Sequence, residues 1–158
     1  MKKVLLVFVL FGALSCSSDD SKKEEEDFSI VGNWKYTAAN TYGSELTLTN
    51  CEKTLSYIEI KEGNAVNVKK GVTDASNESG CKQTTSTGTY VINELDKELI
   101  VSFYSEGKLT SKQNYFIVEL TNSTLKLKLF RNSYFDESNV WIEEGLPEIK
   151  RTVFTYTR

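Results

Sequence analysis

The side chains of this protein that could do chemistry are few, and the lack of histidine limits them most. The 158-residue sequence contains no histidine, which is the residue that most often serves as a base near neutral pH. Catalysis by a Ser-His-Asp or Cys-His set is therefore excluded, and so is a zinc site of the Cys/His type. No glycine-rich phosphate loop follows a predicted strand, so nucleotide binding has no support and we predict no cofactor.

Carboxylates are the remaining candidates for catalysis, and they cluster within residues 132–148. Glu143 and Glu144 lie in this segment, and two carboxylates at a suitable separation can hydrolyse a glycosidic bond. A loop of clustered acids is far more often a solvated surface, so we expect no enzyme and rank a carboxylate hydrolase last. Residues 136–139 (DESN) lack the spacing and the glycine of a calcium-binding loop, and we predict no metal site.

Residues 1–15 have the features of a secretory signal. Two lysines precede an apolar stretch, residues 4–14, which is too short to remain as a membrane-spanning helix. Residues 13–16 (ALSC) resemble the lipobox of bacterial lipoproteins. The resemblance implies that the chain is cut before Cys16 and that acyl groups such as palmitate on this cysteine attach the protein to a lipid bilayer. More than one acyl chain is needed for stable attachment.

Residues 17–27 predict a solvated tether. The segment holds six acids and two lysines and has no large apolar residue, so it cannot bury enough surface to fold. It carries most of the negative charge and leaves the remainder close to neutral, which disfavours nucleic acid and anionic lipid as partners. Residues 16–20 (CSSDD) resemble the acidic export signal of surface lipoproteins of the Bacteroidetes, which implies the outer membrane, at its surface or its periplasmic face.

Two further cysteines, Cys51 and Cys81, form a pair. An even number of cysteines in an exported chain is most simply explained by a disulfide. Such a bond would close a loop of about 30 residues and, on the chain-entropy model, stabilise the fold by about 3–4 kcal/mol. The alternative is a metal site on the two thiolates, which lacks the additional cysteine or histidine ligands that it would need.

From residue 28 onward the pattern is typical of an all-β domain. β-Branched and aromatic residues dominate, and turn residues recur between short apolar runs. Leu125, Leu127 and Leu129 alternate with lysines, as in a strand with one buried face. About eight such runs predict a small antiparallel up-and-down β-barrel, with an open sandwich as the alternative. The predicted strands are residues 30–38, 54–61, 65–72, 86–93, 97–104, 112–120, 124–131 and 149–157.

Two segments between the predicted strands are too long to be hairpin turns. Residues 73–85 are polar and carry Cys81, and residues 132–148 carry Trp141. We expect irregular loops in both segments, because long connections in small domains are often functional. A short helix is expected within residues 42–51.

Residues 32–34 (GNW) resemble the Gly-x-Trp motif that opens the first strand of lipocalins. The resemblance implies that Trp34 closes one end of a barrel, with Gly32 allowing the chain to bend beside the ring. It also implies that an arginine of the last strand, Arg151 or alternatively Arg158, stacks on the indole. The order of lipobox, acidic spacer, Gly-x-Trp strand and cysteine pair resembles the lipocalin-like domain of Bacteroidetes lipoproteins, with residues 28–158 as the barrel domain.

This resemblance implies a monomeric, membrane-anchored protein that binds a small, largely apolar ligand inside the barrel. A barrel of eight strands can hold one small ligand, or its own side chains can fill it. The bulky aromatic residues expected on inward-facing positions are the candidates for the ligand contacts. These candidates are Tyr36, Phe103, Phe116, Phe154 and Tyr156.

The alternative function is a surface-displayed interaction module with a filled barrel core. Its contacts with a glycan or a protein would come from the exterior loops. Trp141, between Val140 and Ile142 in a segment rich in acids and amides, is the best candidate contact. The same three residues could instead form a short strand that places the Trp141 ring in the core.

Overall fold

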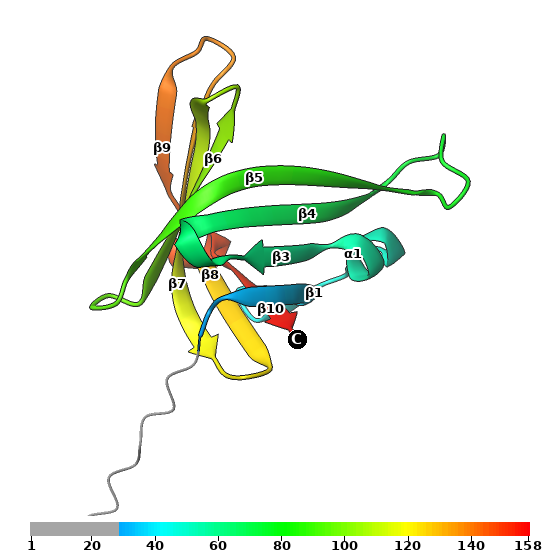
Figure 1. Cartoon of the computed structure of the whole chain (residues 1–158), viewed down its shortest axis with the longest axis horizontal. Coiled ribbons are helices and arrows are strands. Elements are labelled where there is room, and N and C mark those ends of the chain that lie inside the picture. The colour runs from blue at the N-terminus through cyan, green and yellow to red at the C-terminus, as the bar shows by residue number, and fades with distance from the viewer. Residues whose placement is uncertain (1–28) are drawn as a thin grey trace, which may run out of the picture.

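An antiparallel sheet closes on itself within residues 29–158, the part of the chain that the computed structural model describes (Figure 1). The predictions for the signal, Cys16 and the tether lie outside the described residues. Among residues 29–158, no helix combines the length and the apolar character that crossing a membrane requires. The strands are β1 (Gly32–Thr41), β2 (Ser44–Leu46), β3 (Tyr57–Ile60), β4 (Ala65–Thr73), β5 (Cys81–Asn93), β6 (Glu98–Ser105), β7 (Lys108–Leu120), β8 (Thr124–Phe135), β9 (Trp141–Gly145) and β10 (Thr152–Thr157), and the helices are α1 (Asn50–Leu55), η1 (Glu62–Asn64) and η2 (Glu148–Lys150).

The last strand closes the barrel. β10 pairs with β8 on one side and with β1 on the other, so that Tyr156 lies between Leu125 and Tyr36 in the ladder. The closed circuit contains eight antiparallel strands in the order β1-β3-β4-β5-β6-β7-β8-β10. The predicted eight-stranded antiparallel barrel is confirmed. Closure provides hydrogen-bond partners for the backbone N–H and C=O groups that an open sheet would leave unpaired along its edges.

Two strands lie outside this circuit. β2 pairs only with β1, and β9 pairs with the second half of β8, from Arg131↔Gly145 to Phe135↔Trp141. In Figure 1 the β8–β9 hairpin extends past the barrel wall together with the turn between β6 and β7. The prediction of an irregular loop over residues 132–148 is therefore wrong, because β8 and β9 form a hairpin there. The loop predicted over residues 73–85 is shorter in the structure, because β4 ends at Thr73 and β5 begins at Cys81.

The helix expected within residues 42–51 lies further along the chain. Thr49 caps α1: its hydroxyl accepts the Glu52 N–H at 3.2 Å, and the Glu52 carboxylate accepts the Thr49 N–H at 2.9 Å. This reciprocal capping fixes the first turn after residue 49. The preceding residues Ser44–Leu46 pair with β1 instead.

α1 is held at the barrel rim by β4 and by the disulfide. A side chain at Gly71 of β4 would place its Cβ 2.0 Å from the Cys51 carbonyl oxygen, so the absence of a side chain lets the helix lie directly on the strand. Cys51 and Cys81 are joined by a disulfide, with Cα atoms 5.4 Å apart. The predicted disulfide is confirmed. A six-residue helix is too short to be stable alone, so these contacts determine where it lies.

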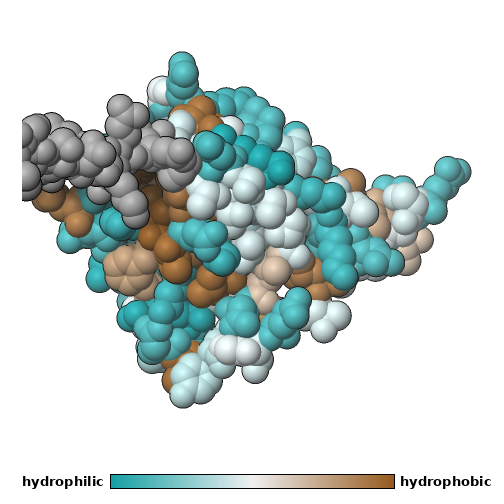
Figure 2. All heavy atoms as spheres, turned by 90° about the horizontal axis from the view of Figure 1, so that it is seen from below, coloured by the Kyte–Doolittle hydropathy of each residue, from teal (hydrophilic) through white to brown (hydrophobic). Residues whose placement is uncertain are grey.

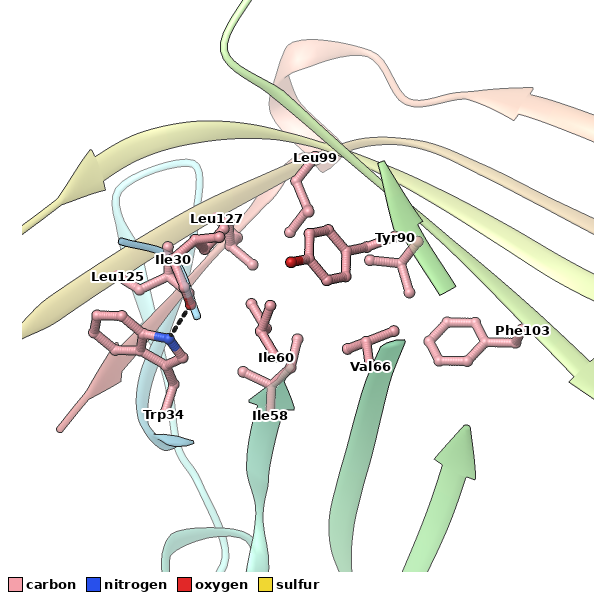
Figure 3. Close-up of a cluster of buried hydrophobic side chains, with 11 residues drawn as sticks. Ile30, Trp34, Ile58, Ile60, Val66, Tyr90, Leu99, Phe103, Leu125 and Leu127 are labelled. Atoms are coloured by element: carbon pink, nitrogen blue, oxygen red, sulfur yellow. Dashed lines mark hydrogen bonds between the residues drawn. The ribbon is translucent and has the colours of Figure 1, made fainter. Parts of the chain in front are cut away.

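Apolar side chains fill one half of the barrel (Figure 3). Trp34, Leu99 and Leu125 are fully buried there. Leu99, Val101 and Phe103 of β6 alternate inward as the sequence pattern predicts. The core cluster comprises Ile30, Trp34, Ile58, Ile60, Val66, Tyr90, Leu99, Val101, Phe103, Leu125 and Leu127.

Candidate functional site

The end of the barrel where β1 begins and β10 ends is sealed by Trp34. Its indole N–H donates to the Ile30 carbonyl at 2.7 Å, and the Arg158 guanidinium lies 3.8 Å from the ring centre. The guanidinium also donates to the carbonyls of Ser29 and Val31. Gly32 has a φ of 149°, and a Cβ there would lie 3.2 Å from the guanidinium. The seal thus combines a buried ring, a stacked cation and a glycine that makes room for the cation.

Arg158, and not Arg151, stacks on Trp34. Arg151 comes just before β10, whereas Arg158 follows its last residue, and the Trp34 end of β1 pairs with the end of β10. Arg151 instead donates to the Leu146 carbonyl at 2.9 Å and forms an ion pair with Glu148 at 2.6 Å. The preference for Arg151 is wrong because the two arginines flank β10 at its opposite ends, and the end next to Arg151 pairs with Thr41, at the far end of β1 from Trp34.

Above the filled half, the barrel opens into a cavity of about 300 Å³, which we call the cup. Aromatic rings form much of its wall: the Tyr36 ring centre lies 5.6 Å from that of Tyr156 and 6.1 Å from that of Phe154, and the Tyr115 ring meets Phe154 edge-on at 6.3 Å. The cup is therefore apolar in its body. Its lining consists of Tyr36, Glu52, Ser56, Tyr57, Val68, Lys69, Lys70, Gln113, Tyr115, Phe154 and Tyr156.

Three phenol groups bring polar atoms into the cup. The Tyr115 hydroxyl donates to the Gln113 side-chain carbonyl at 2.7 Å. Burial raises the pKa of Tyr115, and burial together with the neighbouring Tyr115 and Tyr36 raises the pKa of Tyr156. The pKa of Tyr36 is raised by burial and by the Glu52 carboxylate. All three hydroxyls therefore stay protonated across the physiological range and can donate hydrogen bonds.

The rim of the cup carries charged groups from α1 and β4. Glu52 of α1 and Lys70 of β4 both face the opening. The pKa of Glu52 is lowered, first by its hydrogen bond from the Thr49 backbone, and Lys70 nearby adds to this. Within residues 29–158, no group of three or more metal-ligating side chains lies together. The arrangement is thus that of an apolar pocket with polar atoms at defined places, as in sites for small molecules.

The comparison with known proteins is consistent with this architecture. The model of a family described as the lipocalin-like domain matches residues 30–127, which is well over half of the chain. This protein belongs to the lipocalin-like domain family. Among solved structures it resembles a bovine odorant-binding protein, a deswapped triple mutant, with a TM-score of 0.40 and 13% identity over 80% of this chain and 72% of that chain. No curated protein matches it.

Three of the five residues predicted to line the interior of the lipocalin-like domain meet at the cup. These are Tyr36, Phe154 and Tyr156. Phe103 points inward but belongs to the core, where it is 9% exposed and lies opposite Gly88. It contacts the filled half of the barrel and does not line the cavity.

The prediction for Phe116 is wrong. Its ring stacks on Phe130 at 4.1 Å, and its register partner on β8 is Lys128. Ile117, the next residue, packs against the core instead. Register shifts interrupt the β7–β8 ladder between Asn114 and Tyr115 and again after Ile117. The second shift inserts Val118 into β7, so that Ile117 and Leu120 both face inward, and the face assigned to Phe116 from simple alternation with Leu120 does not hold.

Sequence reasoning missed Tyr115, Gln113 and the part of the rim that α1 supplies. In the run from Tyr115 to Val118 every residue is apolar or aromatic, so alternation does not identify its inward face. The sequence does contain one signal for the rim. Thr49 and Glu52 have the spacing of a capping box, which marks the start of a helix just before Cys51.

Trp141 of the lipocalin-like domain lies away from the cup, on the β8–β9 hairpin. Its ring meets Phe135 edge-on at 4.9 Å, and its N–H donates to Glu143 at 3.3 Å. Trp141 opens a short strand, as the alternative prediction had it, but the ring is half-buried and does not belong to the core. On the face in Figure 2, hydrophilic side chains prevail and the apolar ones lie in separate patches.

Proposed function

We propose that the lipocalin-like domain binds one small, largely apolar molecule in the cup. The observation that carries this proposal is a cavity of about 300 Å³ with an aromatic wall at the open end of a closed barrel. A cavity lined by rings offers a large apolar contact area, and the hydroxyl and amide groups at its wall can orient a guest.

The filled half of the barrel limits the size of the guest. Leu125 and Leu127 are fully buried beside Tyr156 and Phe154, with which they pair in the β8–β10 ladder. Together with Trp34 they belong to the buried core cluster and do not line the cavity. The cup is at the small end of the range of ligand pockets, which runs from about 300 to 1,000 Å³. The guest is therefore a compact molecule and not a long chain that threads the barrel.

The neutral fluorescent probe N-phenyl-1-naphthylamine tests this proposal. Its fluorescence is expected to rise on titration with the protein and to saturate at one probe per chain, because its rings leave water for the cup. Val68→Trp places a large ring in the cup and is expected to abolish the rise. Circular dichroism and thermal unfolding establish that this variant is folded.

Val91→Trp is the matched control. Val91 lies on β5, is 59% exposed and does not line the cup, so the same substitution there should leave the titration unchanged. Unsaturable binding, or equal binding by Val68→Trp and the unchanged protein, would show that the probe adheres elsewhere and that the cup is not a ligand site.

We also propose that the protein is attached to the outer membrane through acyl groups on Cys16. The support is the resemblance of residues 13–16 to a lipobox and the acidic segment that follows. Cells expressing the chain with radiolabelled palmitate are expected to label it, and Cys16→Ser should abolish the label and release the chain from the membrane fraction. Cys51→Ser/Cys81→Ser serves as the control for labelling at another cysteine. Label that persists in Cys16→Ser would disprove the anchor.

A further inference from the structure

We propose that the cup selects a ligand that bears a carboxylate on a short apolar body. This inference rests on the proposed function and specifies the chemistry of the guest. It follows from three independent features: the balance of hydrogen-bond donors over acceptors in the lining, the charges at the rim, and the packing of the aromatic wall.

The free polar groups of the cup are mostly donors. Within residues 29–158 the hydroxyls of Tyr36 and Tyr156 donate to no protein acceptor, and the side-chain oxygen of Gln113 is occupied by Tyr115, which leaves the Gln113 amide N–H groups as donors. Ser56 accepts the Gly71 N–H at 2.9 Å and retains its own proton for donation. A guest that offers only donors would leave these groups unpaired, whereas an oxygen acceptor satisfies them.

The charges at the rim favour a negative acceptor. Lys70 faces the opening, and the single acid there is Glu52. The Glu52 carboxylate already accepts both the N–H and the hydroxyl of Thr49. Lys69, which precedes Lys70 on β4, points to the outer face of the barrel, where it pairs with Tyr57 in the ladder and lies over its ring at 4.8 Å. Lys70 is exposed, and no carboxylate of the described residues lies within ion-pair distance of its amine.

The aromatic wall does not form a cage for a cation. Neighbouring ring centres are only 5.6–6.3 Å apart, which is the separation of rings in mutual contact. A cation would therefore meet one ring face at most, and Lys70 at the rim would repel it. An anion with an apolar body meets neither obstacle: its body contacts the rings and its oxygens lie beside the donors.

The test compares 2-naphthoate with 2-naphthylmethanol, two ligands of the same shape that differ in charge. Isothermal titration of the intact protein is expected to give an affinity for the carboxylate about tenfold higher, because hydrogen bonds to a charged group are the stronger ones. Tyr156→Phe, Tyr36→Phe and Lys70→Met each remove a donor or the charge while retaining most of the side chain. Each is expected to weaken naphthoate more than naphthylmethanol and so to reduce the preference several-fold, because the hydrogen bond lost to a charged oxygen is the stronger one.

Lys53→Met is the matched control for Lys70→Met. Lys53 is exposed on α1 and does not line the cup, so its loss should leave both affinities unchanged. Equal affinities of the unchanged protein for the two ligands, with N-phenyl-1-naphthylamine still bound at one site, would overturn the carboxylate inference alone. Failure of all three compounds to bind would overturn the proposed function as well. The comparison in the unchanged protein decides the question even if a variant does not fold.

Discussion

Trp34→Ala is expected to lower the free energy of unfolding by about 3–5 kcal/mol, as deletion of a large buried ring does in other proteins. The ring is fully buried and contacts the core at the sealed end. Its removal leaves a cavity beside Ile58 and Leu125, deprives the Ile30 carbonyl of its donor and removes the surface on which Arg158 stacks. Urea unfolding followed by circular dichroism measures the change from the midpoint at constant slope.

Two further variants test the role of the Trp34 ring in stability, one at the same position and one at the other tryptophan. Trp34→Phe keeps an aromatic ring but loses the N–H donor, and we expect a loss of about 1–3 kcal/mol for the unpaired carbonyl and the smaller ring. Trp141→Ala removes the other tryptophan, which is half-buried on the β8–β9 hairpin, and should cost less than about 1 kcal/mol. Equal losses for Trp34→Ala and Trp141→Ala would mean that Trp34 does not seal the barrel.

The sequence was sufficient to predict the closed barrel because the alternation is strong where strands have one wet face. β6 and the first half of β8 show it clearly, because apolar residues alternate into the core along both strands and the lysines of β8 point outward. The cysteine pair was also predictable, since no other partner in the described domain could take either thiol. The barrel follows from local alternation, and the disulfide follows from the lack of any other cysteine in the domain. A single sequence can supply both kinds of information.

The details of the site depend on register, which the sequence does not display. The Phe116 position was misassigned because a bulge at Val118 changes the inward face partway along β7, from Ile117 before it to Leu120 after it. The choice between Arg151 and Arg158 depended on where β10 begins, and strand ends are poorly defined by composition. The rim residues Glu52 and Lys70 come from a helix and a strand, so the alternation pattern does not relate them. They lie at the same opening because α1 packs directly on β4 at Gly71.

The bond between Cys51 and Cys81 connects the stability of the domain to the shape of its cup. The double variant Cys51→Ser/Cys81→Ser is expected to lose about 3–4 kcal/mol of unfolding free energy, because the bond closes a loop across 30 residues and restricts the unfolded chain. A second effect should be local. α1 has only six residues and the bond attaches it to β5, so amide hydrogen exchange in α1 should accelerate more than exchange in β6.

The cup should weaken together with the helix. Glu52 and Ser56 contribute to its wall from α1 and the residue that follows the helix, so greater motion there exposes the guest to water and lowers the affinity for N-phenyl-1-naphthylamine. Dithiothreitol added to the unchanged protein should reproduce the effect, and replacing the reductant with oxidised glutathione should reverse it by re-forming the bond, whereas the double variant should not respond. If the double variant were destabilised but bound the probe with unchanged affinity, the disulfide would stabilise the barrel without shaping its opening, and the capping box and Gly71 would suffice to hold α1 in place.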